Sequence, residues 1–388
     1  MMSKLLLQIN GVGRILSCKP LWHLHYYSSN TAASSRNQPQ NPDSMVGHLI
    51  DSLGFSQTQA LSVRKRLSAY KSFKQDPDLV VSFFQGLGLD KTQIKRFIST
   101  EPRLLFCSVD KALKPRVQIF QDLGLSGPDL TAFLAYHAYI LRRTDCYIRR
   151  PIECLRDMLG CDEIVVEVVK RCGRLLDPYA PLAIEPNVAL LRKFGWSGDK
   201  ISKLIVNKPW IILRETKWLE GLLQGVETDF GIPRECKMFY HGVLVYASLK
   251  KSTFDEKIEN FRSCGWTDTS IRSLVRNLPF TFTLSEANVR KSAGFFMGEL
   301  GYTDEYLASH PVLLSLSLER RVKPRYEILK ILIEKKLISE KVNHYNAFCF
   351  NDLKFVNLYL HPYKDEIPEK YESYMSNCRR GMVRRAEN

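Results

Sequence analysis

Hydrophobic and polar positions along this chain repeat with a long, steady period. Eight glycines mark the period, and from the second one onward the residue before each glycine is apolar. The glycines are Gly54, Gly88, Gly124, Gly160, Gly195, Gly231, Gly265 and Gly301, separated by steps of 34, 36, 36, 35, 36, 34 and 36 residues. A period of this length over most of a chain is typical of stacked supersecondary units.

The positions after each glycine predict a joint between two helices. The glycine itself is expected to close a helix in the left-handed conformation. Two residues later, six of the seven units from Gly88 onward carry a short oxygen side chain that we expect to cap the next helix, namely Asp90, Ser126, Asp162, Ser197, Thr267 and Thr303. Six residues after the glycine, six units carry an apolar residue that we expect to be buried, namely Ile94, Leu130, Val166, Ile201, Ile271 and Leu307.

Proline predicts where the first helix of a unit ends. Pro102, Pro209 and Pro279 lie fourteen residues after their glycines, and proline cannot extend a helix. Each unit is therefore expected to hold a first helix of about ten residues, a break and a second helix that runs to the next glycine. The predicted fold is all-α, a solenoid of about eight helical repeats.

Two units carry a pattern that resembles the mTERF repeat. The best copy has LGLDKTQI at 87–94, EPRLL at 101–105 and LKPRV at 113–117, and the last unit repeats it with HPVLL at 310–314 and VKPR at 322–325. The resemblance covers about residues 48–338. It implies an all-helical solenoid, right-handed or curved, that binds nucleic acid within mitochondria or chloroplasts. The family includes transcription terminators on duplex DNA and factors for organellar RNA maturation.

Some units depart from the pattern, so no base contact is transferred from the family. Ala138, Arg174 and Val245 stand where a proline is expected, and the proline of the last unit comes four residues early. The pentatricopeptide solenoid is the nearest rival, but its step is almost fixed at 35 residues, whereas the step here varies.

The two ends of the chain differ from the repeat. Residues 1–42 hold four basic residues and no acid and are rich in Ser, Leu and Ala, which is the composition of an organelle transit peptide. We expect this leader to be disordered and to direct the chain to the mitochondrion, with the chloroplast as the alternative. The solenoid is predicted over 43–338, followed by a C-terminal cap and a basic tail over 339–388.

The positive charge predicts a polyanionic partner. The net charge is +15, of which the leader contributes +4, so the excess belongs mostly to the predicted solenoid. A first basic set lies nineteen and twenty residues after the glycines: Arg143, Arg214, Lys250, Lys251, Arg320 and Arg321. A second basic set lies twenty-five and twenty-six residues after them: Lys114, Arg149, Arg150, Lys257, Arg290 and Lys291. Residues at equal positions of a solenoid stack along one face, so either set is a candidate phosphate-binding track.

Other chemistry is not indicated. The ten cysteines and eight histidines show no metal-ligand spacing. Gly11 and Gly13 lie in the leader and lack the third glycine of a phosphate loop. No segment approaches the length of a membrane span. We therefore predict a monomer that is not an enzyme, with no metal, cofactor, small-molecule substrate or membrane partner. Trp196, Trp266 and Tyr302, which directly follow their glycines, are expected to pack in the core.

Three functions remain after these exclusions. The first is an organellar factor that binds duplex DNA and regulates transcription, through termination. The second is an organellar RNA-binding factor for intron splicing or transcript stability. The third is a protein-binding helical scaffold.

Overall fold

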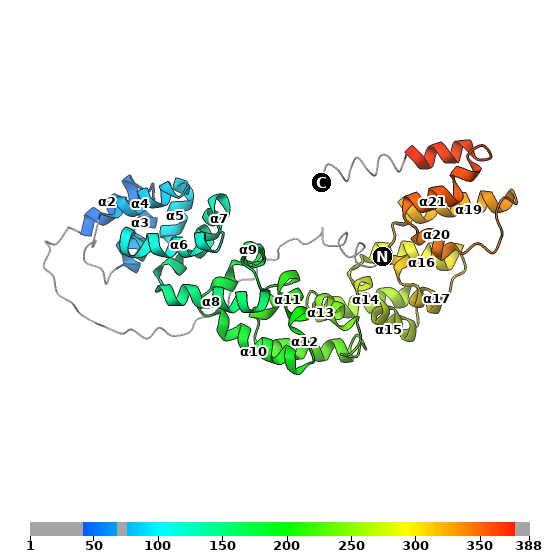
Figure 1. Cartoon of the computed structure of the whole chain (residues 1–388), viewed down its shortest axis with the longest axis horizontal. Helices are drawn as coiled ribbons and strands as arrows, with labels where there is room; N and C mark the ends of the chain where they lie inside the picture. Colours follow the sequence, from blue (N-terminus) through cyan, green and yellow to red (C-terminus); the bar gives the residue numbers. More distant parts are fainter. Residues whose placement is uncertain (1–41, 68–75, 377–388) are drawn as a thin grey trace.

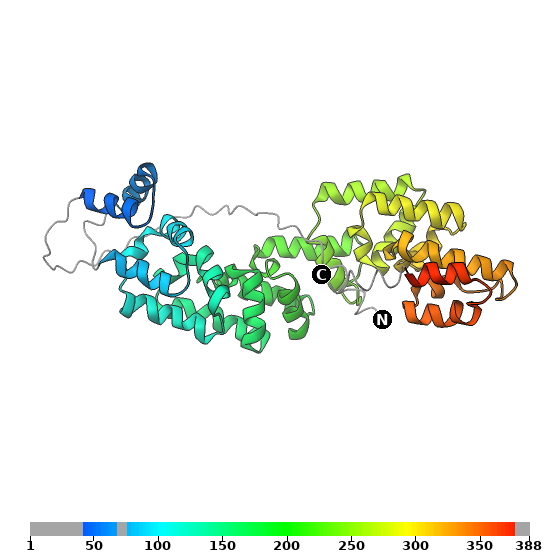
Figure 2. The same ribbon diagram turned by 90° about the horizontal axis from the view of Figure 1, so that it is seen from above.

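The structure, a computed structural model, describes residues 42–67 and 76–376 and is helical throughout these ranges. The helices stack into one long arc (Figure 1), and the view from above shows how extended the molecule is (Figure 2). In the middle of the arc, α9, α11 and α13 lie on the concave side and α10 and α12 on the convex side. The leader and the tail arginines Arg379, Arg380, Arg384 and Arg385 lie outside the described residues.

Each unit contains a first helix, a short helical turn and a second helix. The first helices are α3 (Gln57–Arg66), α5 (Lys91–Thr100), α7 (Gly127–His137), α9 (Asp162–Arg171), α11 (Gly198–Asn207), α13 (Phe239–Tyr246), α15 (Asp268–Asn277) and α17 (Asp304–Ser309). The second helices are α4 (Pro77–Gly86), α6 (Lys114–Asp122), α8 (Asp145–Leu159), α10 (Ala180–Lys193), α12 (Thr216–Thr228), α14 (Lys251–Ser263), α16 (Glu286–Ala293) and α19 (Lys323–Glu334). An additional helix, α2 (Pro42–Asp51), precedes the first unit.

The break predicted in each unit is itself helical in most units. Five 3₁₀ helices occupy it, η1 (Pro102–Phe106), η3 (Ala138–Arg142), η4 (Gly173–Leu176), η5 (Ile211–Leu213) and η6 (Pro279–Thr283), and the short helix α18 (Val312–Ser315) takes this place in the last unit. These turns bury apolar pairs such as Leu104 and Leu105, so the break contributes to the core. Because η3 and η4 form without proline, burial of these pairs is sufficient to specify the turn.

Short π-helical stretches join or extend some second helices. They are η2 (Val109–Leu113), η7 (Gly294–Glu299) and η8 (Leu318–Val322). η2 and η8 run directly into the Lys-Pro pairs that begin α6 and α19. A proline has no N–H to donate and crowds the preceding turn, which accounts for the wider turn at these two places.

The eight glycines confirm the predicted register. All eight have a positive φ, between 62° at Gly231 and 107° at Gly124. Six of the apolar positions were predicted to be buried, and five are; the exception is Val166, which is half-buried because the neighbouring Val165 takes the core position. Trp196 and Trp266 are buried as expected, whereas Tyr302 is half-buried against Phe296 and Tyr306.

The predicted caps are correct in four of six units. Asp90, Ser197, Thr267 and Thr303 each accept a hydrogen bond from the helix that follows. The prediction is wrong for Ser126, whose side chain makes no capping bond, and for Asp162, which is the first helical residue. The Asp162 carboxylate instead binds the Arg156 guanidinium of α8 at 2.6 and 2.8 Å, so the ion pair replaces the cap.

We expect Gly195→Ala to destabilise the protein by about 1 kcal/mol or more, because a side chain is strained at its φ of 79°. Gly221→Ala is the matched control. It lies on the exposed face of α12 with open space around an added Cβ, and it should stabilise the helix by about 0.5–1 kcal/mol. Urea unfolding followed by circular dichroism measures both. Equal urea midpoints for the two variants would contradict the left-handed conformation of Gly195.

Within residues 42–67 and 76–376, the left-handed position recurs once at a residue other than glycine. Lys336 has a φ of 57° and lies 35 residues after Gly301. Its N–H donates to Ile333 O at 2.8 Å, and the Leu337 N–H donates to Leu332 O at 2.9 Å, as at the glycine joints. The chain then continues in α20 (His344–Cys349), α21 (Asp352–Tyr359), the turn η9 (His361–Tyr363) and a helix at 368–376. The predicted domain limits at 42 and 338 stay predictions.

A buried or half-buried polar side chain ties several second helices to the unit that follows. Arg116, Asn187, Lys257 and Arg325, which we call the clasp residues, occupy nearly equivalent positions of their second helices. Each donates to backbone carbonyls at or near the end of the next unit's first half: Arg116 to Leu141, Asn187 to Ile212 and Arg214, Lys257 to Leu284, and Arg325 to Ala347, Phe348 and Phe350. The ends of these short helices leave carbonyls without helical partners, and the clasp residues satisfy them.

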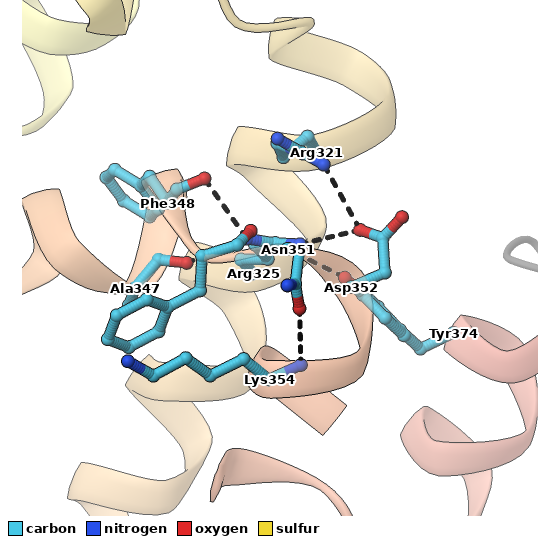
Figure 3. Close-up of polar contacts among 9 residues, drawn as sticks. Arg321, Arg325, Ala347, Phe348, Asn351, Asp352, Lys354 and Tyr374 are labelled. Atoms are coloured by element: carbon cyan, nitrogen blue, oxygen red, sulfur yellow. Dashed lines mark hydrogen bonds and ion pairs between the residues drawn. The ribbon is translucent and has the colours of Figure 1, made fainter. Parts of the chain in front are cut away.

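The Arg325 clasp is the most elaborate (Figure 3). The side chain is fully buried; besides the three carbonyls, its Nη2 contacts Asp352 at 2.6 Å and its Nε donates to the Tyr374 hydroxyl at 3.0 Å. The guanidinium also lies 4.5 Å from the centre of the Phe355 ring. Arg325 therefore joins α19, α20, α21 and the C-terminal helix at one point.

Candidate nucleic-acid interface

Most of the first basic set gathers at one edge of the solenoid, where each short turn meets a second helix. Arg143 and Arg214 directly follow this turn, and Lys250 holds the corresponding place before α14, in a unit without a 3₁₀ helix. All three share an extended backbone, with ψ between 153° and 164°. Lys251 is the first residue of α14. We call these four residues the joint cations. Units at equal positions stack in order, so the joint cations lie along a single edge.

Arg320 and Arg321 do not share that position, although counting from the glycine places them there. The last unit reaches its short helix four residues early, so Leu316 holds the extended position and the two arginines lie inside η8. Arg321 is moreover paired with Asp352 at 3.4 Å. Their part in binding stays a prediction, but the register that united them with the joint cations is wrong.

The joint cations carry positive charge that the described chain leaves unneutralised. Arg214, Lys250 and Lys251 are exposed and Arg143 is half-buried. No carboxylate of residues 42–67 or 76–376 forms an ion pair with any of the four. Cations without an intramolecular partner can neutralise phosphates without first losing an ion pair.

The second basic set lies at the start of α6 or one to two turns into the other second helices, and its members form ion pairs more often. Lys114 contacts Asp110 at 2.6 Å, Arg150 contacts Glu185 at 3.3 Å and Arg290 contacts Glu286 at 3.9 Å. Arg149 and Lys291 are exposed. In α10 and α12 the equivalent positions hold Glu185 and Glu220, so a continuous basic track through this set is interrupted in the middle of the arc.

Lys257 of the second basic set is structural. Its Nζ donates to Leu284 O at 2.6 Å as a clasp residue, and burial lowers its pKa. An ammonium group held in this way is not presented to a ligand. The other members stay candidates for phosphate contact.

Sequence reasoning missed the aromatic side chains beside the joint cations. Tyr179 lies at the joint of the unit between Arg143 and Arg214 and is 52% exposed. The Arg143 guanidinium is 5.3 Å from the Tyr179 ring centre, and that of Arg214 is 4.8 Å from the Trp218 ring centre. One signal was available: an aromatic residue follows the cation by four positions in Arg143/Tyr147, Arg214/Trp218 and Lys250/Phe254.

The described part of the chain offers little for other chemistry. No group of three or more His, Cys, Asp or Glu side chains in it is arranged to hold a metal ion. Among the same residues, no helix is both long enough and apolar enough to cross a membrane.

Comparison with known proteins gives a family match across most of the chain. The mTERF family model matches residues 48–356. The chain is 21% identical over 251 residues to the mitochondrial transcription termination factor MTERF15 of Arabidopsis thaliana, covering 64% of this chain and 55% of the relative. It is 24% identical over 260 residues to the chloroplastic transcription termination factor MTERF8 of the same plant, covering 64% and 50%. The mitochondrial transcription termination factor MTEF18 is 20% identical over 287 residues, covering 72% and 48%. The chain thus spans about half the length of the curated relatives it matches.

Proposed function

Because this chain belongs to the mTERF family, we propose that it is a nucleic-acid-binding factor, not an enzyme, that acts in organellar gene expression. The observation that carries the proposal is the row of joint cations, which stand unpaired along one edge of the arc. Adjacent packed helices are about 8–10 Å apart. Joint cations in adjacent units, such as Arg214 and Lys250, would therefore be spaced like about every third phosphate along a duplex strand, whose rise is about 3.4 Å per nucleotide.

Duplex DNA is the proposed ligand and transcription termination the proposed outcome. The names of the three relatives, each a transcription termination factor, support this choice. Two of them are mitochondrial and one is chloroplastic, so we propose the mitochondrion as the location and the chloroplast as the alternative. The protein is proposed to act as a monomer whose edge follows the phosphate backbone.

Organellar RNA is the second candidate ligand. The exposed Tyr179 ring beside Arg143 favours it, because sequence recognition in RNA targets unpaired bases that stack on aromatic and guanidinium planes.

Binding measurements on the full chain test the proposal. Fluorescence anisotropy with a labelled DNA duplex and with single-stranded RNA of the same sequence should show binding that weakens as salt rises. Crosslinking in isolated organelles, followed by sequencing of the bound fragments, then identifies the natural ligand. A protein scaffold would instead bind neither ligand, and its complex in an organelle extract would keep its gel-filtration volume after nuclease digestion.

A further inference from the structure

The clasp residues recur in every second unit. Arg116, Asn187 and Lys257 lie on α6, α10 and α14, and Arg325 lies on α19. The second helices between them, α8, α12 and α16, hold an apolar residue 36 positions after the preceding clasp residue, namely Ile152, Leu223 and Ala293. These three are buried, and their side chains have no group that donates a hydrogen bond. From α6 to α19, boundaries with a clasp therefore alternate with boundaries that lack one.

Two boundaries without a clasp leave open space between their second helices. A cleft of about 380 Å³ separates α8 from α10 and is lined by side chains of both helices, Met158 and Val188 among them. A cleft of about 740 Å³ is lined by side chains of α12, α14 and α15. The Arg150–Glu185 ion pair spans the first cleft, but both side chains are more than half exposed, and an exposed pair of this kind adds little stability.

The boundaries without a clasp are held together on the side of the first helices. Side chains donate there from the first half of one unit to that of its neighbour: Tyr139 to Asp177 at 2.7 Å, Tyr240 to Lys203 O at 3.0 Å and Asn277 to Ala308 O at 2.9 Å. A boundary that is bonded on one side and open on the other has the geometry of a hinge. In the middle of the arc the first helices lie on the concave side (Figure 1), so widening a cleft between second helices bends the arc more strongly and closing it straightens the arc.

We infer that the solenoid bends at alternate boundaries, and that two units joined by a clasp move as one rigid body. Opening a clasped boundary removes the donor from carbonyls such as Ile212 O and Leu284 O, whose desolvation is then uncompensated. Widening a cleft exposes surface that already borders open space and breaks no buried hydrogen bond. The inference goes beyond the proposed function, because it concerns the free protein and requires no ligand.

Distances between spin labels on the full chain, without nucleic acid, test the inference. Glu153, Ala189 and Gln224 are exposed and lie at one position of α8, α10 and α12, 29 residues after their glycines. Labels at 153 and 189 span a boundary without a clasp, and labels at 189 and 224 span the boundary that Asn187 clasps. Attaching the labels to an unnatural ketone amino acid leaves the native cysteines untouched. Double electron–electron resonance should give a distance distribution at least about twice as wide for the first pair as for the second.

Asn187→Leu removes the clasp at nearly constant side-chain volume. It should widen the distribution of the 189/224 pair towards that of the 153/189 pair and leave the 153/189 pair unchanged. Asn277→Leu is the matched control, since it removes a hydrogen bond at a different boundary and should change neither distribution. Equal widths for the two wild-type pairs would overturn the inference, as would an unchanged 189/224 width in a folded Asn187→Leu variant. If Asn187→Leu does not fold, the comparison of the two wild-type pairs decides alone.

Discussion

Replacing Arg325 by Met should lower the free energy of unfolding of the C-terminal end by about 3–5 kcal/mol. The substitution leaves Asp352 without its 2.6 Å partner and leaves the carbonyls of Ala347, Phe348 and Phe350 without a donor. Each buried group that loses its partner contributes its own desolvation cost. The free energy of unfolding of Arg325→Lys should lie between those of the wild type and Arg325→Met, because one ammonium group cannot reach all five acceptors that the planar guanidinium binds.

Hydrogen exchange measured by mass spectrometry shows where the loss occurs. In a solenoid each unit is stabilised by its neighbours, so exchange should speed up roughly a hundredfold or more over 344–376 and little in the units before Gly265. Arg320→Met, an exposed arginine in the preceding turn, is the control and should exchange like the wild type. Unchanged protection over 344–376 in Arg325→Met would show that the clasp does not hold this end.

Charge reversal at three joint cations, Arg143→Glu, Arg214→Glu and Lys250→Glu, should weaken nucleic-acid binding at least about a hundredfold near 100 mM salt. The reason is the loss of three phosphate contacts, each of which releases counterions on binding. The slope of log affinity against log salt should become shallower by about three. Anisotropy titrations over a range of salt concentrations give both quantities.

A second triple variant distinguishes the effect of losing the joint cations from the effect of changing the net charge. Lys114→Glu, Arg149→Glu and Lys291→Glu change the total charge by the same amount, but they lie on the second helices, where the basic track is interrupted by Glu185 and Glu220. This triple should lose much less affinity and keep most of the salt slope. Equal effects of the two triples would mean that binding follows overall charge and that the joint edge is not the contact surface.

Much of the fold could be predicted from residues that act locally. A glycine after a helix, an oxygen side chain two positions on and an apolar residue four positions further each work within one turn, so their spacing alone locates the first helices. The wrong predictions of a cap and of a core residue arose where another residue competes for the same role. Asp162 serves Arg156 instead of a cap, and Val165 takes the core position expected for Val166.

The site was less predictable because it depends on register between units. Counting from the glycine assigned Arg320 to the joint edge, yet the early Pro311 moves that unit's joint to Leu316. The clasp role of Lys257 could not be seen either, since its acceptor, Leu284 O, lies 27 residues away in the next unit. Tyr179 was missed because an isolated tyrosine carries no signal until its neighbour Arg143 is in place.

The clasp residues have a mechanical consequence. Arg116, Asn187 and Lys257 each span a single boundary between units, so strain at one of these boundaries is not passed directly to the next. A rotation of a few degrees at each of several boundaries would add up to a large change in end-to-end distance while every clasp keeps its hydrogen bonds. The solenoid should therefore be able to change its curvature to match the shape of a bound ligand.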